Sequence, residues 1–166
     1  MVPGEIEANL ERLHVDSFAW ALACCRRNRE EAEDVLQAAY LKILDGRASF
    51  GGRSSFKTFL FGVIRRTAAE SRRRDAIRWL LASRWTHRRE PAEPAPEERL
   101  ALLSALARLP GRQRQVLQLV SYLGLTVEEA GETLGVSAGT ARVHYERGKR
   151  RMRQLLGPPE REEIRA

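Results

Sequence analysis

The residues best suited to chemistry in this chain bind rather than catalyse, and the densest group lies in residues 137–153, with six basic residues and one acid. Just before it, Thr126 and Glu129 have the spacing of a capping box, which begins a helix. Gly135 then allows a sharp turn, and Ser137 is a good N-cap for a second helix. A helix, a glycine turn and a capped second helix predict a helix-turn-helix, the motif that places its second helix in the DNA major groove.

The second helix of this motif separates an apolar side from an arginine-rich side. The apolar side holds Ala141, Tyr145, Gly148, Met152 and Leu155 at helical spacing. The opposite side holds Arg142, Val143, Glu146, Arg147 and Arg150. Arginine forks can read guanine edges in the major groove, while Lys149, Arg151 and Arg153 would contact phosphates. A surface helix that is merely rich in arginine is the alternative, and the capped turn in front of this helix favours DNA binding.

A second group combines cations with an aromatic ring, on a helix expected to begin at Phe56. The outward face of that helix would carry Lys57, Thr58, Phe61, Arg65, Ala69 and Arg72. An aromatic side chain among cations can stack on an unpaired base and hold its phosphates. A helix rotated the other way would instead bury Phe61, and the periodicity alone leaves both arrangements open.

A third group is suited to contact with another protein. Asp34, Gln37 and Leu41 fall on one side of a helix expected at about residues 30–45, opposite its core residues. An exposed leucine beside a carboxylate and an amide could receive a helix of a partner. Single exposed leucines are nevertheless common and need no partner, so both interpretations stay open.

The chain shows no arrangement typical of an enzyme or a metal site. The adjacent Cys24 and Cys25 cannot form a disulfide scaffold, and His14, His87 and His144 are too scattered for metal-ligand spacing. Cys25 falls on the core side of its helix, so packing explains it. No glycine-rich phosphate loop, paired catalytic carboxylates or nucleophile with its base is present. We therefore expect a protein without enzymatic activity, cofactor or metal.

These groups must be positioned by helices, because strand and hairpin signals are nearly absent and helical periodicity runs through the chain. Helices are expected over residues 8–27, 30–45, 56–74 and 126–134, and again after Ser137. The Gly- and Ser-rich residues 47–55 are expected to form a loop. A further apolar segment consists of Trp79, Leu80, Leu81 and Trp85. It would either continue the last helix of the first domain over its core or dock an inhibitor.

A break in composition divides the chain at residues 86–97, which contain three prolines and no apolar period. We expect an all-α fold of two small helical domains, residues 5–78 and 97–157, the second containing the helix-turn-helix. A flexible linker over residues 79–96 would join them. Residues 158–166 would form a tail.

Size and charge agree with a helical protein that binds a polyanion. The 166 residues are 43% hydrophobic, enough for packed cores. The longest apolar run, Phe18 to Cys25, is too short to cross a bilayer and no signal peptide opens the chain, so we expect a cytoplasmic protein without membrane insertion. The net charge is +7, and the positive charge is concentrated in residues 137–153 and in residues 65–90. Residues 65–90 contain nine arginines and three acids. Two basic blocks indicate two contacts with nucleic acid, and solvated helix faces are the alternative.

Three runs of sequence resemble bacterial sigma factors of the extracytoplasmic-function type, in the sigma-70 family. The resemblance to region 4 is carried by LPGRQRQVLQLVSYLGLTVEEAGETLGVSAGTARVHYERGKRRMRQLL, residues 109–156. The resemblance to region 2 is carried by AEDVLQAAYLKIL, residues 32–44, and FGGRSSFKTFLFGVIRRTAAESRRR, residues 50–74. Order, spacing and the short linker match over roughly residues 10–156.

The resemblance implies a partner for each group of residues. The residues it assigns to the clamp helices of the polymerase β′ subunit are Asp34, Gln37, Leu41 and Lys42. In this family region 2 melts the promoter −10 element by trapping an unstacked base, and the residues so assigned are Phe50, Ser54, Lys57, Phe61, Arg65 and Arg66. The residues assigned to −35 DNA are Ser137, Thr140, Arg142, Val143, Glu146, Arg147, Lys149 and Arg150. The β flap of polymerase and an anti-sigma factor are further implied partners.

The sequence departs from the pattern of the family at several of these positions. In region 2, Ala38 replaces the usual acid, Phe59 replaces a tryptophan and Gly62 replaces an arginine. Arg66 replaces a residue that is often an amide. In region 4, the pair Val143-His144 replaces a Ser-Arg pair. The first change would weaken clamp binding. The changes at Arg66 and Val143 mean that the promoter sequence of relatives does not transfer to this chain.

The sequence thus predicts a sigma factor that binds core RNA polymerase and directs promoter-specific initiation, in response to a stress or environmental signal relayed by an anti-sigma factor. Two alternatives use the same residues differently. A stand-alone helix-turn-helix regulator would bind a palindrome as a dimer and gain nothing from the Asp34 side. A sigma mimic that sequesters an anti-sigma factor would be expected to lose the arginines that this helix keeps.

Overall fold

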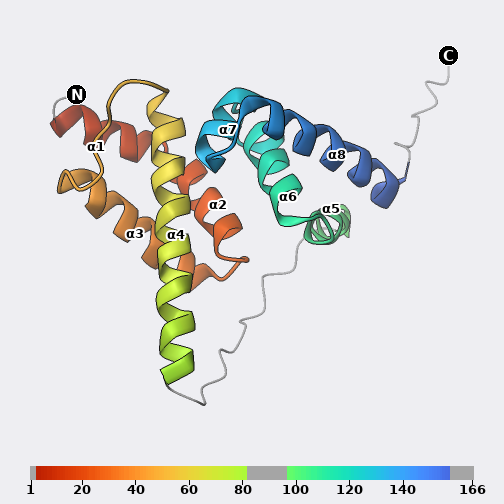
Figure 1. Cartoon of the computed structure of the whole chain (residues 1–166), viewed down its shortest axis with the longest axis horizontal. Coiled ribbons are helices and arrows are strands. Elements are labelled where there is room, and N and C mark those ends of the chain that lie inside the picture. The colour runs from red at the N-terminus through yellow and green to blue at the C-terminus, as the bar shows by residue number, and fades with distance from the viewer. Residues whose placement is uncertain (1–2, 82–96, 158–166) are drawn as a thin grey trace.

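The computed structural model describes residues 3–81 and 97–157, and every regular element in these ranges is a helix (Figure 1). The first domain holds α1 (Pro3–Arg12), α2 (His14–Cys24), α3 (Arg29–Leu44) and α4 (Phe56–Leu81). The second holds α5 (Glu97–Ala107), α6 (Gly111–Leu117), the π-helical turn η1 (Gln118–Tyr122), α7 (Val127–Leu134) and α8 (Ala138–Leu156). The expected all-α fold of two small helical domains is confirmed.

The first expected helix, residues 8–27, is two helices in the structure. α1 and α2 meet at the buried Leu13, and α2 ends at Cys24. Beyond that end, Arg26 and Arg27 take left-handed backbone conformations, with φ of 52° and 65°, which no α-helix continues. An apolar period that keeps the same side buried across a break cannot reveal the break.

The helix expected to end near Arg74 continues to Leu81, so the first three residues of the expected linker are helical. The interpretation that the apolar segment continues the last helix is therefore right for the backbone of residues 79–81. The rest of the expected linker, the tail, Trp85 and His87 lie outside the described residues.

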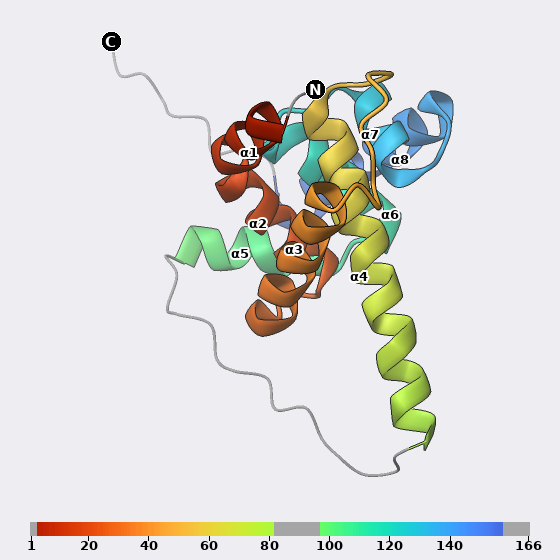
Figure 2. The same cartoon turned by 90° about the vertical axis from the view of Figure 1, so that its left-hand side faces the viewer.

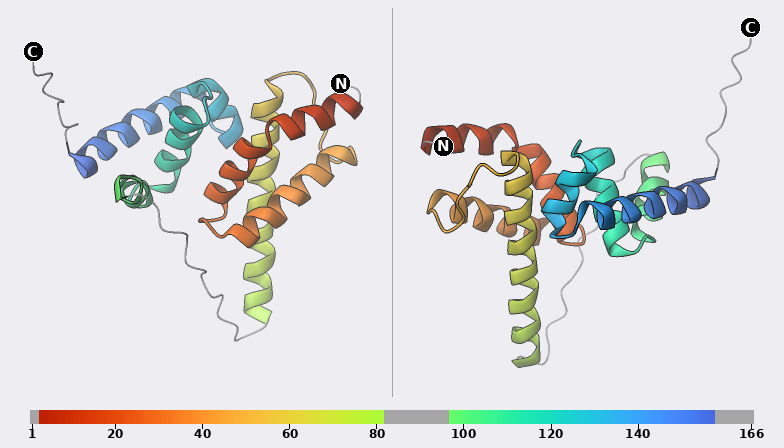
Figure 3. Two further views of the ribbon diagram at one scale, coloured as in Figure 1. Left: turned by 180° about the vertical axis from the view of Figure 1, so that it is seen from behind. Right: turned by 45° about the horizontal axis from the view of Figure 1, so that its top comes forward.

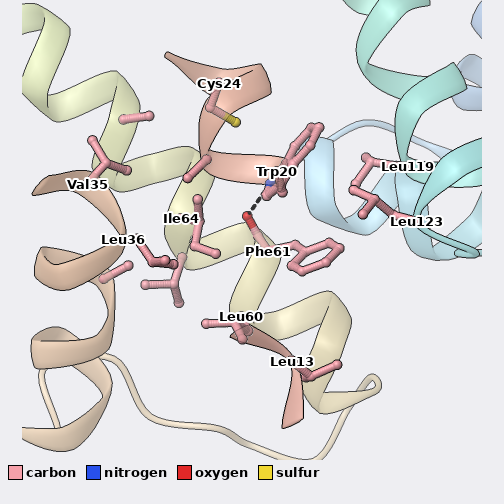
Figure 4. Close-up of a cluster of buried hydrophobic side chains, with 14 of the residues drawn as sticks. Leu13, Trp20, Cys24, Val35, Leu36, Leu60, Phe61, Ile64, Leu119 and Leu123 are labelled. Atoms are coloured by element: carbon pink, nitrogen blue, oxygen red, sulfur yellow. Dashed lines mark hydrogen bonds between the residues drawn. The ribbon is translucent and has the colours of Figure 1, made fainter. Parts of the chain in front are cut away.

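Trp20 of α2 is buried in the core, on the side of the first domain that faces Leu119 of the second (Figure 4). Its side chain is fully buried, and the indole Nε1 donates a hydrogen bond to the Phe61 carbonyl oxygen at 3.0 Å. Leu60 and Ile64 of α4 join the same cluster as Leu36 of α3. This packing of α2, α3 and α4 fixes which side of α4 faces away from the first domain.

In the second domain, α6 and α8 approach closely because Gly148 has no side chain. A Cβ atom at this position would lie 2.9 Å from Leu117 Cδ1 and 3.3 Å from the Gln113 carbonyl oxygen, which is closer than such atoms normally come. The apolar side predicted for the helix after Ser137 is thus the side on which α8 packs.

The two domains pack against each other. α7 runs beside α4, near the N-terminal end of α4, as the views in Figures 1, 2 and 3 agree. Leu119, Leu123 and Leu134 of the second domain belong to the same buried cluster as Trp20 and Phe61 of the first. The C-terminal part of α4 extends beyond the other helices. The sequence predicted two domains, but it did not predict this contact.

Candidate nucleic-acid interface

The geometry of α7 and α8 is that of a helix-turn-helix. The Glu129 amide donates to Thr126 Oγ1 at 3.1 Å, and the Thr126 amide donates to Glu129 Oε2 at 2.9 Å, so the predicted capping box is formed. Gly135 has a φ of 65°, which turns the chain sharply after α7. Ser137 Oγ then accepts from the Thr140 amide at 3.1 Å and caps α8. The expected motif is present with both expected caps.

The side of α8 that faces away from α6 and α7 is exposed. It presents Arg142, Val143, Glu146, Arg147 and Arg150, as expected. Two of the predicted contacts are tied to neighbours, since Arg142 pairs with Glu128 at 2.8 Å and Lys149 pairs with Glu146 at 2.9 Å. Within residues 3–81 and 97–157, neither Arg147 nor Arg150 has an acidic partner. These two guanidinium groups can therefore bind an anion without first breaking an ion pair.

A shallow groove of about 490 Å³ runs beside this exposed side of α8. It is lined by Arg108, Pro110, Gln113, Arg147, Arg150, Arg151 and Gln154. Arg108 comes from the turn between α5 and α6, far from α8 in the sequence. Arg108 and Gln113 were not predicted from the sequence, because the spacing within α8 carries no information about which residues of another helix lie next to it. The four arginines make this groove a site suited to phosphate.

Phe61 does not lie on an exposed face. Its side chain is fully buried, stacked on Trp20 with ring centroids 6.2 Å apart, and it points toward the side on which Leu119 and Leu123 of the second domain lie (Figure 4). Of the two arrangements that the periodicity left open, the structure has the one in which Phe61 is buried. Periodicity within α4 could not reveal this, because the second domain covers that side. Lys57 Nζ lies 5.6 Å from the Phe61 ring centroid and pairs with Asp16 at 2.7 Å.

Other polar side chains of this α4 face are bonded to α7. Ser55 Oγ and Thr58 Oγ1 donate to Glu129 Oε1 at 3.0 and 3.3 Å, and Arg65 Nη2 donates to the Leu134 carbonyl oxygen at 2.5 Å. The backbone bond from Thr126 and these hydroxyls lower the pKa of Glu129, against the effect of partial burial. Partial burial lowers the pKa of the Arg65 guanidinium, which still carries its charge.

The remaining residues assigned to −10 DNA lie near the start of α4. Phe50 packs on Phe56 and Phe59, with ring centroids 5.5 and 5.4 Å away, which anchors the loop before α4. Ser54 is half-buried at the end of that loop, whereas Arg66 is exposed. A Cβ atom at Gly62 would lie 3.3 Å from Arg66 Nη1, so the Arg66 guanidinium lies over the space that the glycine leaves.

The α3 side predicted for a protein partner is exposed. Asp34 and Gln37 are exposed, and Leu41 keeps 47% of its surface accessible. These residues line a groove between α3 and α4 of about 490 Å³. Lys42, assigned to the same partner, also bridges the two helices, donating to Thr67 Oγ1 at 3.1 Å and to Glu70 Oε2 at 2.5 Å, with 24% of its side chain exposed.

The described part of the chain contains neither a metal site nor a membrane-spanning helix. Within residues 3–81 and 97–157 there is no group of His, Cys, Asp or Glu able to hold a metal ion, and no helix long and apolar enough to cross a membrane. Cys24 and Cys25 are free, and burial raises the pKa of each thiol to about 12.

Comparison with known proteins assigns each domain to a region of the sigma-70 family. The model of Sigma-70 region 2 matches residues 9–77, and that of Sigma-70, region 4 matches residues 99–152. The RNA polymerase sigma factor CarQ of Myxococcus xanthus is 33% identical over 158 residues, covering 90% of this chain and 88% of CarQ. The ECF RNA polymerase sigma factor ShbA of Streptomyces griseus is 33% identical over 175 residues, covering 93% and 90%.

Solved structures share the arrangement of helices. The sigma factor RpoE of Bartonella quintana, in complex with the anti-sigma factor NepR, superposes with a TM-score of 0.70 at 22% identity, covering 92% of this chain and 96% of that one. CnrH, in complex with the cytosolic domain of CnrY, gives a TM-score of 0.63 at 22% identity, covering 91% and 86%. These structures support the fold, and the relatives identify the family. The chain belongs to the extracytoplasmic-function sigma factors of the sigma-70 family.

Proposed function

We propose that this sigma factor binds core RNA polymerase through α3, reads −35 DNA with α8 and opens the −10 element with α4. The observation that carries the proposal is the exposed arginine side of a capped second helix, on a chain that also contains region 2 in the family order. Its role is binding rather than catalysis, and it would act in the bacterial cytoplasm. Because RpoE was solved with an anti-sigma factor, an anti-sigma factor is the expected regulator here.

Each interface has its own residues. The proposed clamp contacts are Asp34, Gln37 and Leu41, with Lys42 holding α3 on α4 beneath them. The proposed −35 contacts are Ser137, Thr140, Arg142, Val143, Glu146, Arg147, Lys149 and Arg150. The proposed −10 contacts are Phe50, Ser54, Lys57, Phe61, Arg65 and Arg66.

The test is assembly with core polymerase followed by promoter-specific run-off transcription, using Asp34→Ala and its neighbour Glu33→Ala as a matched pair. Both acids are exposed on α3, but Glu33 pairs with Arg29 at 2.9 Å and, unlike Asp34, is not among the residues that line the groove between α3 and α4. We expect Asp34→Ala to weaken core binding by about tenfold or more, the effect of losing one hydrogen-bonded charge at a protein interface. Glu33→Ala should change it by less than about twofold. Absence of a stable core complex with the unchanged protein at moderate salt would overturn the proposal.

The groove beside α8 extends the DNA contact. We expect a backbone phosphate to bind between Arg108 and Arg151, because both guanidinium groups line that groove. Arg108→Ala should weaken binding to −35 duplexes of any sequence and lower the salt slope of log K by about one. Fluorescence anisotropy across a salt series measures this slope. An unchanged slope would remove Arg108 from the interface.

A further inference from the structure

Val143 is an exposed apolar residue among the charged residues on the exposed side of α8. It keeps 46% of its surface accessible, and it takes no part in the buried cluster that the described residues form. The other exposed large apolar residue of α8, Leu156, is the last residue of the helix. Packing within the protein therefore does not account for the valine, although single exposed apolar residues are common.

The charged neighbours of Val143 are held in place by partners within the protein. Arg142 pairs with Glu128 of α7 at 2.8 Å, so its guanidinium is held toward α7. Glu146, one helical turn after Val143, pairs with Lys149 at 2.9 Å. Valine is branched at Cβ and loses little rotamer freedom on binding. Val143 thus presents rigid methyl groups between charged side chains whose positions are fixed.

DNA offers one kind of apolar group at the base edges of its major groove, the C5-methyl group of thymine. Val143 lies in the second turn of α8, within the N-terminal part of the helix, which is the part that contacts base edges in a helix-turn-helix. The methyl groups of valine can pack on that thymine methyl. The serine that is usual in the family at this position offers a hydroxyl instead, which can bond to several bases.

We propose that Val143 reads a thymine of the −35 element through its C5-methyl group, beside a guanine read by Arg147. This inference rests on the proposed function, since it takes α8 as the helix that enters the major groove. Arg147 lies four residues after Val143 on the same side of α8 and has no acidic partner within residues 3–81 and 97–157. Four residues rise about 6 Å along a helix and successive base pairs are about 3.4 Å apart, so the two bases lie within two base pairs of each other.

The first test identifies the bases that each side chain reads, using the full chain in complex with core polymerase. A pool of duplexes randomised over the −35 element is selected separately with the unchanged protein, Val143→Ser, Val143→Thr and Arg147→Ala. Val143→Ser removes both methyl groups of the valine, whereas Val143→Thr keeps one of them in nearly the same shape. We expect the unchanged protein and Val143→Thr to enrich a thymine that Val143→Ser no longer selects. Arg147→Ala should lose a guanine, on either strand, within two base pairs of that thymine.

The second test removes the methyl group from the DNA instead of from the protein. In the selected duplex each thymine is replaced in turn by deoxyuridine, which lacks the C5-methyl group and keeps the O4 acceptor. At one thymine, we expect the replacement to weaken binding of the unchanged protein by about fourfold, the worth of burying one methyl group. The same replacement should leave the affinity of Val143→Ser unchanged, because its partner methyl groups are already absent. Fluorescence anisotropy of the complex with core polymerase measures both.

A matched control is available at Val15, an exposed valine of α2 in the first domain. Val15→Ser makes the same chemical change outside α8, so it should respond to each deoxyuridine as the unchanged protein does.

The outcomes separate failure of this inference from failure of the proposed function. If the complex with core enriches a −35 sequence but no thymine depends on residue 143, the inference is wrong and the function stands. Equal sensitivity of the unchanged protein and Val143→Ser to deoxyuridine at every thymine also rejects it, as does a Val143→Thr variant that behaves like Val143→Ser. A guanine that is absent, or that lies more than two base pairs from the thymine, rejects the pairing with Arg147. If the protein forms no complex with core, or the complex enriches no sequence, the proposed function itself is wrong.

Discussion

Gly62 and Arg66 lie four residues apart on α4, and the exposed Arg66 side chain covers the buried glycine. The family usually has an arginine at the first position, and here the Arg66 guanidinium lies over the glycine, 3.3 Å from where a Cβ would be. The two departures from the family pattern are therefore coupled. A cation is retained at the same place on the helix, but the residue that carries it is Arg66, one helical turn later.

This coupling predicts the behaviour of a double variant. Arg66→Asn should weaken binding of the polymerase complex to single-stranded −10 DNA by about fivefold, the worth of one exposed phosphate contact. Gly62→Arg combined with Arg66→Asn should restore it, because an arginine at the first position returns the cation to the same patch. Fluorescence anisotropy with a labelled non-template strand measures both. A double variant as weak as the single one would show that the positions act independently.

Burial lowers the reactivity of the Cys24 and Cys25 thiols. The thiolate is the form that alkylating reagents attack, and a pKa of about 12 leaves about one thiol in ten thousand ionised at pH 8. We expect maleimide to modify neither cysteine of the native protein within the time in which it modifies both in urea. Mass spectrometry after timed quenching reads this out. Rapid modification without denaturant would mean that the C-terminal end of α2 opens readily.

At the scale of helices, the sequence predicted what local signals determine. The capping box at Thr126, the turn at Gly135 and the cap at Ser137 each depend on neighbours within three residues, and all three are present in the structure. The break at Leu13 was not predicted, whereas the extension of α4 to Leu81 was one of two interpretations of the apolar segment. The first leaves the apolar period intact, and the second depends on residues past the last core position of α4.

The close approach of α6 and α8 makes a prediction with a matched control in the same helix. Gly148→Ala places a methyl group 2.9 Å from Leu117 Cδ1, whereas at Gly139 the nearest atom would be 4.0 Å away. Overpacking costs about 1–3 kcal/mol, so Gly148→Ala should be less stable than Gly139→Ala by about that amount, although both gain helix propensity. Urea unfolding followed by circular dichroism measures the difference. Equal stability would show that Leu117 moves aside freely.

At the scale of the whole molecule, the residues of the candidate site could be named from the sequence. Which of them are buried, and which are bonded to the other domain, could not be predicted. Phe61 was identified as a base-stacking candidate, yet it is buried in one cluster with Leu119, Leu123 and Leu134, which lie far away in the sequence. Glu129 was identified as a capping residue. Its hydrogen bonds to Ser55 and Thr58 of the other domain could not be predicted from the spacing of nearby residues. Such contacts arise from how two finished helices fit together, which periodicity does not describe.

The contact between domains should respond to acid through Glu129. Its pKa in the folded protein is lowered from the ordinary value of 4.5, so its contribution to stability is complete above that value and is lost as the pH falls through the lowered pKa. Glutamine at this position does not titrate. We expect the unchanged protein to be more stable than Glu129→Gln at pH 6, and the difference to shrink below about pH 4.5. Urea midpoints of both proteins between pH 3 and 6 test this, and a constant difference would contradict it.

The order in which the core is assembled has a consequence for synthesis. Residues 3–81 leave the ribosome before α7 has been made, so Phe61 and its neighbours emerge before Leu119, Leu123 and Leu134, which belong to the same buried cluster. At ordinary translation rates, about 3–14 s separate the appearance of Arg65 from that of Leu134. During that interval the nascent chain presents an apolar surface flanked by cations, one that either a chaperone or a nearby nucleic acid could occupy before the protein is complete.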